Sequence, residues 1–533
     1  MHCRSYLYPG RMMKMKKQKI YFLCNSVDIE RGGLTKASLK QASLFAELGY
    51  ETEIITFNFN AYYPYIKQKL ADLGKVHPNV FIRNMYEDIE GQKNSELKTK
   101  LKPANLKKLA DGGALSKRNG HNAYRVLKNG YYTKYIGLGK GNTLKLIDYF
   151  NENRYRTRRE EYDPGGNLKR TIYTDLETNK PRQTIYFDKK GRSYLSAWYS
   201  KEKDKYDHIH VFNKKGEITE EYTGDIMKLK QAWLKDLIKD DNNPVIISDT
   251  RSTDAILTGL KAKHAITIWR LHSHYLGAPY KDDSPIANKV EHGLNHMDKF
   301  DGVFLLTNQQ KQDMSDNYGN GEKMYVIGHY HESSKSFLEK LKPTEKDKNR
   351  AVVISRLSTL KRVDHIIKAF RKVVDQLPNV KLDIYGKGTE EEKLRNLIEQ
   401  LQLTNNVHMS GYTQNPDKAY ENALFTALTS KSEGFSLSVL ESMANKTPVI
   451  SYDIKYGPND LIEHGKNGYI VKDKNIDALA EKMIHLFENP IEAIKMGKNA
   501  EHFIQDHFSK KSYAEKWENY VQHLIEQKSR VQS

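Results

Sequence analysis

A stretch of twelve residues, from Ser432 to Met443, decides the fold that we predict: Ser-Glu-Gly-Phe-Ser-Leu-Ser-Val-Leu-Glu-Ser-Met. Its small residues suit the entrance to a helix, and its later apolar residues give that helix a buried side. We expect Glu433 in the loop at the helix entrance and Glu441 about two turns into the helix. Free N–H groups and the helix dipole at the entrance suit a phosphate or diphosphate. A carboxylate there would instead accept hydrogen bonds from sugar hydroxyls. The alternative is an ordinary amphipathic helix with two surface glutamates.

Glu433 and Glu441, with Gly434 between them, resemble the Glu-x7-Glu signature of retaining GT-B glycosyltransferases that use nucleotide sugars. The resemblance implies that Glu433 faces the hydroxyls of the donor sugar and that Glu441 holds the ribose of the nucleotide. The backbone N–H groups at the helix entrance would then bind the donor diphosphate. That assigns donor binding to Gly434, Phe435, Ser436 and Leu437.

Length and composition limit the class of protein. A chain of 533 residues is too long for one core, so two or three domains are expected, and 38% hydrophobic residues argue against global disorder. Only two cysteines, Cys3 and Cys24, are present, which favours a reducing cytoplasm. The basic segment Met1 to Lys19 lacks the apolar centre of a signal peptide, and Met12, Met13 or Met15 is an alternative start. No apolar run is long enough for a membrane span.

The net charge of +19 implies an anionic partner: nucleic acid, a membrane surface or an acidic polymer. Charge alone does not choose among them. Between residues 101 and 150, ten Lys or Arg stand against two Asp. This region is either a solvated basic face or an anion-binding surface.

The first domain begins with a βαβ pattern. Lys19 to Cys24 and Glu51 to Phe57 read as strands, and a helix between them ends near Leu48. The loop after the first strand contains Gly32 and Gly33, at the carboxyl end of a strand where ligands bind in such folds. A plain tight turn is the alternative; the resemblance implies that these glycines let the backbone approach the donor phosphates and sugar.

From about residue 60 the alternating α/β pattern fails, and an internal repeat follows. Tyr162 to Gly166, Phe187 to Gly191 and Phe212 to Gly216 each combine an aromatic residue, Asp or Asn, and Gly at a period of 25. Such turns between β-rich runs predict a meander of hairpins from about Asn151 to Thr223. Its edge strands must be paired or covered, which predicts self-association.

This insertion resembles the extra β-domain of bacterial teichoic acid α-glycosyltransferases and of related enzymes that modify serine-rich adhesins. In the teichoic acid enzymes the domain is a trimerisation hub. The resemblance therefore implies a homo-oligomer, namely a trimer.

The α/β pattern returns at Pro244 to Arg251, and Ala265 to Leu271 forms a further strand that leads into His272. A histidine after a buried strand is often only a hydrogen-bonded edge residue. The resemblance implies instead that His272 lies near the donor sugar, with His274 as the alternative. The lysine-rich run Glu339 to Arg350 reads as a linker.

The second domain starts at Ala351, and its first strand leads into Arg356 and Lys361. Two bases five residues apart in a strand-to-helix loop can converge on one diphosphate; a solvated basic turn is the alternative. The pair resembles the Arg-x4-Lys motif of the family, but Ser355 and Arg362 stand where the family usually has Gly. Tyr412, after another strand, is assigned to the nucleotide base by the same resemblance.

We therefore predict an α/β protein of the GT-B fold: two Rossmann-like domains facing across a cleft, with a β-hairpin-rich insertion in the N-terminal domain. The expected boundaries are 19–100 with 240–340 for the N-terminal acceptor domain, 101–239 for the insertion, 350–510 for the nucleotide-sugar domain and 511–533 for a C-terminal helix.

The resemblance implies a retaining hexosyltransferase that moves glucose or N-acetylglucosamine from a UDP-sugar to a poly(alditol phosphate) such as wall teichoic acid. We predict Glu433, His272, Arg356 and Lys361 as catalytic residues. No Asp-x-Asp triplet lies in a suitable loop, so we expect neither a metal nor another cofactor. We expect a cytoplasmic enzyme with peripheral contact at the inner face of the membrane, and no nucleic acid partner. The alternatives are a serine-rich protein acceptor and a non-catalytic polyanion-binding scaffold.

Overall fold

The computed structural model describes residues 17–30, 33–91, 100–332 and 345–532. The chain forms two compact units, 1–266 and 267–533, whose boundary falls inside strand β15 (Ile266–Arg270). This boundary divides the predicted N-terminal domain, residues 19–100 with 240–340, between the two units. The expected bounds of the four domains stay predictions. Among the described residues, no helix combines the length and the apolar character that crossing a bilayer requires.

The first unit contains parallel strands in the order β14-β1-β2-β3. All five residues of β1 are buried, and the Phe22 ring packs on Phe45 of the following helix at 5.9 Å. This is the predicted βαβ unit, with strand ends within two residues of those expected. The bounds are β1 (Ile20–Cys24), α1 (Gly33–Glu47), β2 (Thr52–Thr56), β3 (Val80–Asn84), α5 (Ile226–Leu237), β14 (Val245–Ser248) and α6 (Asp254–Thr258).

The expected end of the α/β pattern near residue 60 is wrong. Helix α2 (Tyr63–Asp72) leads to β3, and α3 (Met85–Glu90) follows at once, with Asn84 capping its first N–H groups. The pattern was hidden because Phe81, inside β3, is exposed, and because an aromatic run with Pro64 opens α2. The α/β arrangement therefore continues to residue 90.

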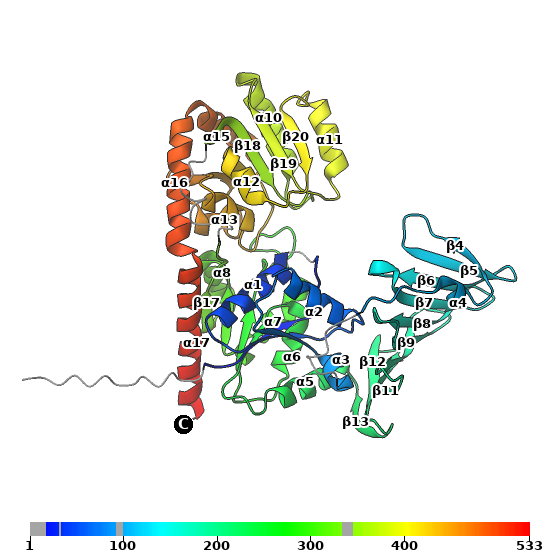
Figure 1. Cartoon of the computed structure of the whole chain (residues 1–533). Helices are drawn as coiled ribbons and strands as arrows, with labels where there is room; N and C mark the ends of the chain where they lie inside the picture. The colour runs from blue at the N-terminus through cyan, green and yellow to red at the C-terminus, as the bar shows by residue number, and fades with distance from the viewer. Residues whose placement is uncertain (1–16, 31–32, 92–99, 333–344, 533) are drawn as a thin grey trace, which may run out of the picture. The chain divides into compact units, whose positions relative to one another are not determined.

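The insertion is one ten-stranded antiparallel sheet in which each strand pairs with the next in sequence, from β4 to β13 (Figure 1). The sheet starts at Ala114, whereas the meander of hairpins was predicted from about Asn151, so the basic stretch 101–150 supplies four of its strands. The bounds are α4 (Leu106–Ala110), β4 (Ala114–Lys117), β5 (Ala123–Lys128), β6 (Tyr131–Leu138), β7 (Leu144–Phe150), β8 (Arg156–Tyr162), β9 (Leu168–Thr174), β10 (Pro181–Phe187), β11 (Ser193–Ser200), β12 (Lys205–Phe212) and β13 (Ile218–Thr223).

The repeat of period 25 is confirmed as hairpin turns. Gly166, Gly191 and Gly216 each close such a turn with a positive φ of 78° to 86°, a conformation that favours glycine. The residue three before each glycine accepts its backbone N–H, and the same Asp or Asn side chain accepts further N–H groups of the turn. The repeat therefore sets the register of three hairpins.

The sheet is anchored to the rest of the first unit. Lys169 on β9 forms an ion pair with Glu90 in which both side chains are buried, and Tyr186 stacks on Tyr86 at 4.9 Å. The Arg170 guanidinium lies 4.4 Å from the centre of the Phe59 ring. These contacts join the middle of the sheet, rather than its edges, to α3 and the loop before α2.

The second unit begins with parallel strands β15, β16 (Gly302–Leu305) and β17 (Met324–Val326), together with α7 (Asn288–Leu294) and α8 (Asn308–Tyr318). A six-stranded parallel sheet follows, in the order β20-β19-β18-β21-β22-β23. Its strands are β18 (Asp347–Ile354), β19 (Lys381–Tyr385), β20 (Val407–Gly411), β21 (Ala423–Leu428), β22 (Val449–Tyr452) and β23 (Gly468–Val471). Strand β18 starts inside the run expected to be a linker.

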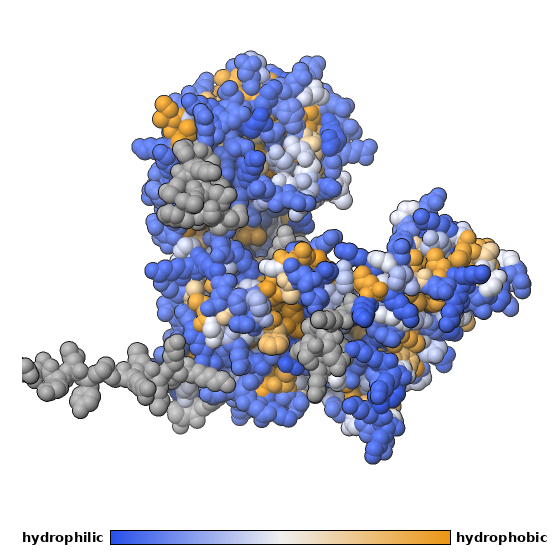
Figure 2. Space-filling model, viewed as in Figure 1, coloured by the Kyte–Doolittle hydropathy of each residue, from blue (hydrophilic) through white to orange (hydrophobic). Residues whose placement is uncertain are grey.

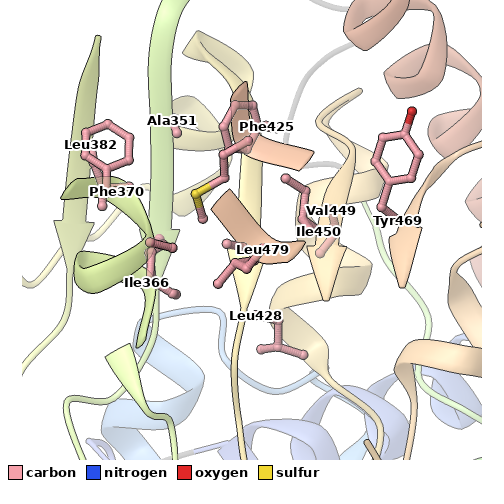
Figure 3. Close-up of a cluster of buried hydrophobic side chains, with 14 of the residues drawn as sticks. Ala351, Ile366, Phe370, Leu382, Phe425, Leu428, Val449, Ile450, Tyr469 and Leu479 are labelled. Atoms are coloured by element: carbon pink, nitrogen blue, oxygen red, sulfur yellow. The ribbon is translucent and has the colours of Figure 1, made fainter. Parts of the chain in front are cut away.

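Helices pack on this sheet through a large apolar core (Figure 3). Phe370 of α10 and Phe425 of β21 both pack against Phe487 of α15. The bounds are α10 (Val363–Gln376), α11 (Glu391–Gln400), α12 (Pro416–Asn422), α13 (Leu437–Ala444), α14 (Pro458–Leu461), α15 (Ile476–Glu488), α16 (Pro490–His507) and α17 (Lys510–Gln532).

The last two helices follow one another along the second unit (Figure 1). On α17, Trp517 packs against Phe304 of β16 at 4.7 Å, and Tyr520 packs against Tyr325 of β17 at 5.0 Å. The last helix therefore packs on the strands that open this unit.

Candidate functional site

A cavity of about 250 Å³ in the second unit lies at the carboxyl end of β18 and the entrance to α13. The residues that follow parallel strands meet at this edge of a sheet, which is where such folds bind ligands. We call it the donor cavity. Eight predicted site residues line it: His272, Arg356, Lys361, Glu433, Gly434, Phe435, Ser436 and Leu437.

An acidic and a basic side chain of the donor cavity contact each other. The Lys361 ammonium forms an ion pair with Oε1 of Glu433, and the Ser430 hydroxyl donates to the same oxygen at 2.6 Å. Both charged side chains are mostly buried. The backbone of Glu433 is also fixed, because its N–H donates to the Lys455 carbonyl and its carbonyl accepts from Tyr456.

A buried hydroxyl lies at the entrance of α13. The Oγ of Ser436 is buried and, among the described residues, has no hydrogen-bond partner. Ser436 is in the left-handed region with φ of 69° and stands immediately before α13. A buried hydroxyl without a partner is costly, so this atom fits a ligand oxygen in the cavity.

Helix α13 begins at Leu437, which corrects the expected depth of Glu441. Glu441 lies one turn into the helix rather than two, because the left-handed Ser436 delays the helix start. It lies outside the lining of the donor cavity, close to the buried Tyr420 of α12. Its predicted contact with the ribose stays a prediction.

The loop before α13 packs directly on the end of β15. A Cβ on Gly434 would lie 2.3 Å from the His272 carbonyl oxygen, which only glycine avoids. The same contact brings His272 to the donor cavity. His329 stacks on the His272 ring at 5.7 Å and meets the Phe435 ring edge to face at 5.5 Å, and it also lines the cavity.

His329 was missed from the sequence. It stands three residues after β17, which is the same signal that selected His272 after β15. His329 could therefore have been found by searching for a histidine after every predicted buried strand.

The choice between His272 and His274 is resolved by position. His274 is buried and does not line the donor cavity. Its Nδ1 accepts the Leu276 N–H at 3.0 Å, and its ring packs on Tyr456 at 4.5 Å. Burial, followed by the nearby charge of Lys455, lowers the pKa of His274 to about 4. His274 is therefore a neutral packing residue at pH 7.

Arg362 occupies a position where the resembled family usually has glycine, and its backbone explains why. Its φ is 47°, in the left-handed region. The buried guanidinium donates to the carbonyls of Thr429 and Ser430 at 2.6 Å each and forms an ion pair with Asp473. These three contacts offset the backbone cost, so the loop keeps a glycine-like path with an arginine.

Comparison with known protein families identifies the family of this chain. The profile described as "Glycosyl transferases group 1" matches residues 334–503, and "Glycosyl transferase 1 domain A" matches residues 21–213. The poly(glycerol-phosphate) alpha-glucosyltransferase of Bacillus subtilis (strain 168) is 30% identical over 525 residues, covering 95% of this chain and 75% of that protein. The chain belongs to the group 1 glycosyltransferases.

Other relatives of this group 1 glycosyltransferase agree. The poly(ribitol-phosphate) alpha-N-acetylglucosaminyltransferase of Staphylococcus aureus (strain COL) is 28% identical and covers 94% of this chain and 99% of that protein. A crystal structure of an S. aureus TarM mutant in complex with fondaparinux, alpha-GlcNAc-glycerol and UDP has a TM-score of 0.78. It is 26% identical, and the match covers 95% of this chain and 99% of that chain.

The GT-B fold class predicted for this glycosyltransferase is thereby confirmed, and so is its resemblance to the teichoic acid enzymes. Because the TarM match covers 95% of the chain, the likeness includes the ten-stranded sheet.

Of the other predicted positions of the glycosyltransferase, Tyr412, like Glu441, does not line the donor cavity, Gly33 lies in the first unit, and Gly32 is outside the described residues. Tyr412 follows β20 and is 64% exposed, and its contact with the base stays a prediction. Gly33 opens α1.

The described residues hold no cluster of three or more His, Cys, Asp or Glu side chains that could bind a metal ion. Metal independence stays a prediction of the sequence.

Proposed function

We propose that this glycosyltransferase moves glucose or N-acetylglucosamine from UDP to hydroxyls of a poly(alditol phosphate), with retention of the anomeric configuration. The observation that carries the proposal is the convergence of Arg356, Lys361, Ser436 and Glu433 on one cavity at the entrance of α13. The cations and N–H groups suit a diphosphate, and the carboxylate suits sugar hydroxyls.

The main chemical difficulty is the departure of UDP, on which negative charge accumulates. Arg356, Lys361 and the N–H groups at the start of α13 are placed to stabilise that charge electrostatically. The departing phosphate then takes the proton of the acceptor hydroxyl on the same face of the sugar. Glu433 orients the sugar through its hydroxyls and is not the nucleophile.

A polyanionic acceptor is supported by charge and by kinship. The chain carries a net charge of +19, and the basic stretch 101–150 forms strands of the ten-stranded sheet. The B. subtilis and S. aureus relatives are named for poly(glycerol phosphate) and poly(ribitol phosphate). We further propose action in the cytoplasm at the inner face of the membrane, where a basic surface meets anionic lipid.

Self-association through the ten-stranded sheet, as a trimer, is part of the proposal. Its two edge strands, β4 and β13, are largely exposed along their length. Apolar residues gather on the visible face of the sheet (Figure 2). Leu115 and Ile218, one on each edge strand, are 41% and 55% exposed, and exposed apolar edge strands favour pairing with another chain.

The test is release of UDP by the purified protein from UDP-glucose or UDP-N-acetylglucosamine, with and without poly(glycerol phosphate) or poly(ribitol phosphate). Release that depends on polymer with one donor supports the proposal and names both substrates. Release only with a serine-rich protein would overturn the acceptor. Failure to bind either donor would favour a non-catalytic scaffold.

A further inference from the structure

A second cavity, of about 970 Å³, lies beside the donor cavity in the second unit. No residue lines both cavities, but residues that are neighbours in the chain line one cavity each. Lys361 lines the donor cavity, whereas its neighbour Arg362 lines the second one. Lys431 and Lys455 also line the second cavity, and Lys455 is the residue whose carbonyl accepts the Glu433 N–H. A ligand in the second cavity therefore contacts the segments that position Glu433.

Part of the positive charge in this cavity is already neutralised. Lys455 forms ion pairs with Asp282 at 2.6 Å and with Asp313 at 2.8 Å. Burial opposes its charge, but these hydrogen bonds outweigh burial and raise the pKa of Lys455. Arg362 is held by Asp473 and by two backbone carbonyls. These two cations stabilise the protein.

Three other cations of the cavity remain available. Lys281, Lys431 and Lys474 line it, their side chains are exposed, and none has an ion-pair partner among residues 17–30, 33–91, 100–332 and 345–532. The remaining carboxylate of the lining, Asp453, accepts a hydrogen bond from Asn459 at 2.8 Å. The cavity thus presents an excess of unpaired ammonium groups.

The chemistry of these groups selects the ligand. A lysine ammonium is a compact charge on a flexible stem, which suits a phosphodiester whose position varies from one repeat to the next. Arg362 supplies the one guanidinium in the lining of this cavity. Its N–H groups already donate to two backbone carbonyls and to Asp473, so it does not offer a pair of parallel N–H groups to a phosphate. The cavity is also about four times the volume of the donor cavity, enough for more than a single phosphate.

We propose that this second cavity is a phosphate subsite for the acceptor polymer, in which Lys281, Lys431 and Lys474 bind a phosphodiester one or more repeats from the hydroxyl that receives the sugar. The inference rests on the proposed function. Because the adjacent residues Lys361 and Arg362 line the donor cavity and the subsite respectively, a bound phosphate sets which hydroxyl reaches the donor sugar. Transfer to a long polymer then has a lower KM than transfer to a single neutral unit.

The test compares the double variant Lys281→Ala/Lys431→Ala with the matched double variant Lys393→Ala/Lys511→Ala. The control lysines belong to the same unit, are 78% and 86% exposed, and do not line either cavity. Each protein is assayed with poly(glycerol phosphate) and with glycerol as a neutral single-unit acceptor, at several salt concentrations.

We expect the KM for the polymer to rise at least tenfold in the subsite variant and to depend less on salt, because fewer charges contact the polymer. The KM for the UDP-sugar and turnover with glycerol should stay unchanged, as should all values of the control. An unchanged polymer KM, or an equal rise in the control, would overturn the subsite while leaving the proposed function intact. Absence of transfer to any polymer by the wild type would overturn the proposed function, and with it the subsite.

Discussion

The Lys361 ammonium is ion-paired with the Glu433 carboxylate in the donor cavity, with 14% and 13% of the two side chains exposed. The residue that we assign to the diphosphate and the residue that we assign to the sugar are therefore ion-pair partners. A diphosphate that enters the cavity must share Lys361 with Glu433. The pair neutralises two of the charges that line the cavity and leaves the positive charge of Arg356.

Replacement of Glu433 separates these two functions. In Glu433→Gln, the sugar loses its charged hydrogen-bond acceptor while Lys361 becomes fully available to the diphosphate. We expect turnover to fall at least tenfold, about 1.4 kcal/mol or more in the barrier, and UDP affinity to be equal or higher. Steady-state kinetics and calorimetric titration with UDP measure the two effects. Wild-type turnover, or a loss confined to UDP affinity, would refute the role of Glu433.

Loss of the Ser436 hydroxyl should weaken donor binding. Its Oγ is buried and has no partner in the part of the chain that the structure describes, and a hydrogen bond to a charged phosphate contributes about 1.5 kcal/mol or more. We therefore expect Ser436→Ala to raise the KM for the UDP-sugar about tenfold with little change in melting temperature. Ser436→Gly is the control. It removes the same hydroxyl and also the steric cost of a left-handed backbone, so it should melt at a higher temperature than Ser436→Ala. Unchanged donor KM in both variants would exclude this contact.

The contact between Gly434 and the end of β15 should tolerate no side chain. In Gly434→Ala, the new Cβ would meet the His272 carbonyl oxygen at 2.3 Å, so the loop that carries Glu433 must move. We expect at least a tenfold loss of turnover and a lower melting temperature. Gly465→Ala is the matched control: its φ is 76° and nothing lies within 4 Å, so it should lose stability and keep activity. Equal activity in the two variants would contradict the packing argument.

The buried His274 should make stability depend on pH. Unfolded, its imidazole binds a proton below its ordinary pKa of about 6.5, whereas in the folded protein it does so only below a pKa of about 4. Between these values the unfolded chain binds more protons, so stability falls as pH falls from 6.5 to 4 and is unaffected above 6.5. In His274→Asn, whose amide oxygen can accept the Leu276 N–H, this slope should flatten by up to about 1.4 kcal/mol per pH unit. Identical slopes in chemical denaturation would exclude His274 as a source.

Association through the ten-stranded sheet should depend on its edge. Leu115, on edge strand β4, is 41% exposed, and a lysine there would oppose pairing with a second copy. We expect Leu115→Lys to shift the protein from trimer to monomer in light scattering coupled to size-exclusion chromatography. Ile491→Lys is the control, since Ile491 is 81% exposed on α16, outside the sheet. A monomeric wild type, or a trimer in both variants, would refute the assignment.

Much of the second domain could be predicted from the sequence because its strands are short apolar runs between turn signals. Its first strand was expected to lead into Arg356, and β18 ends at Ile354, two residues before it. The predictions failed where the hydrophobic pattern of the sequence is weak. Strands β4 to β7 are partly exposed and rich in Lys and Tyr, so they read as a basic surface rather than as a sheet.

Eight predicted site residues line the donor cavity, whereas Glu441, from the same motif as Glu433, does not. The contacts inside the cavity could not be predicted. The ion pair of Lys361 with Glu433 joins residues 72 positions apart, and no spacing rule reveals it. Arg362 in a left-handed conformation depends on Thr429, Ser430 and Asp473, which are distant in sequence. Such features follow from tertiary packing, so only the folded structure reports them.

Retaining transfer of a hexose to a poly(alditol phosphate) can be observed in the product itself. We would record proton NMR spectra of poly(glycerol phosphate) or poly(ribitol phosphate) after incubation with the wild-type protein and an α-linked UDP-sugar. We predict a new anomeric signal with the small coupling constant of an α-linked sugar on the polymer. A β-linked product, or a polymer that carries no sugar, would contradict it.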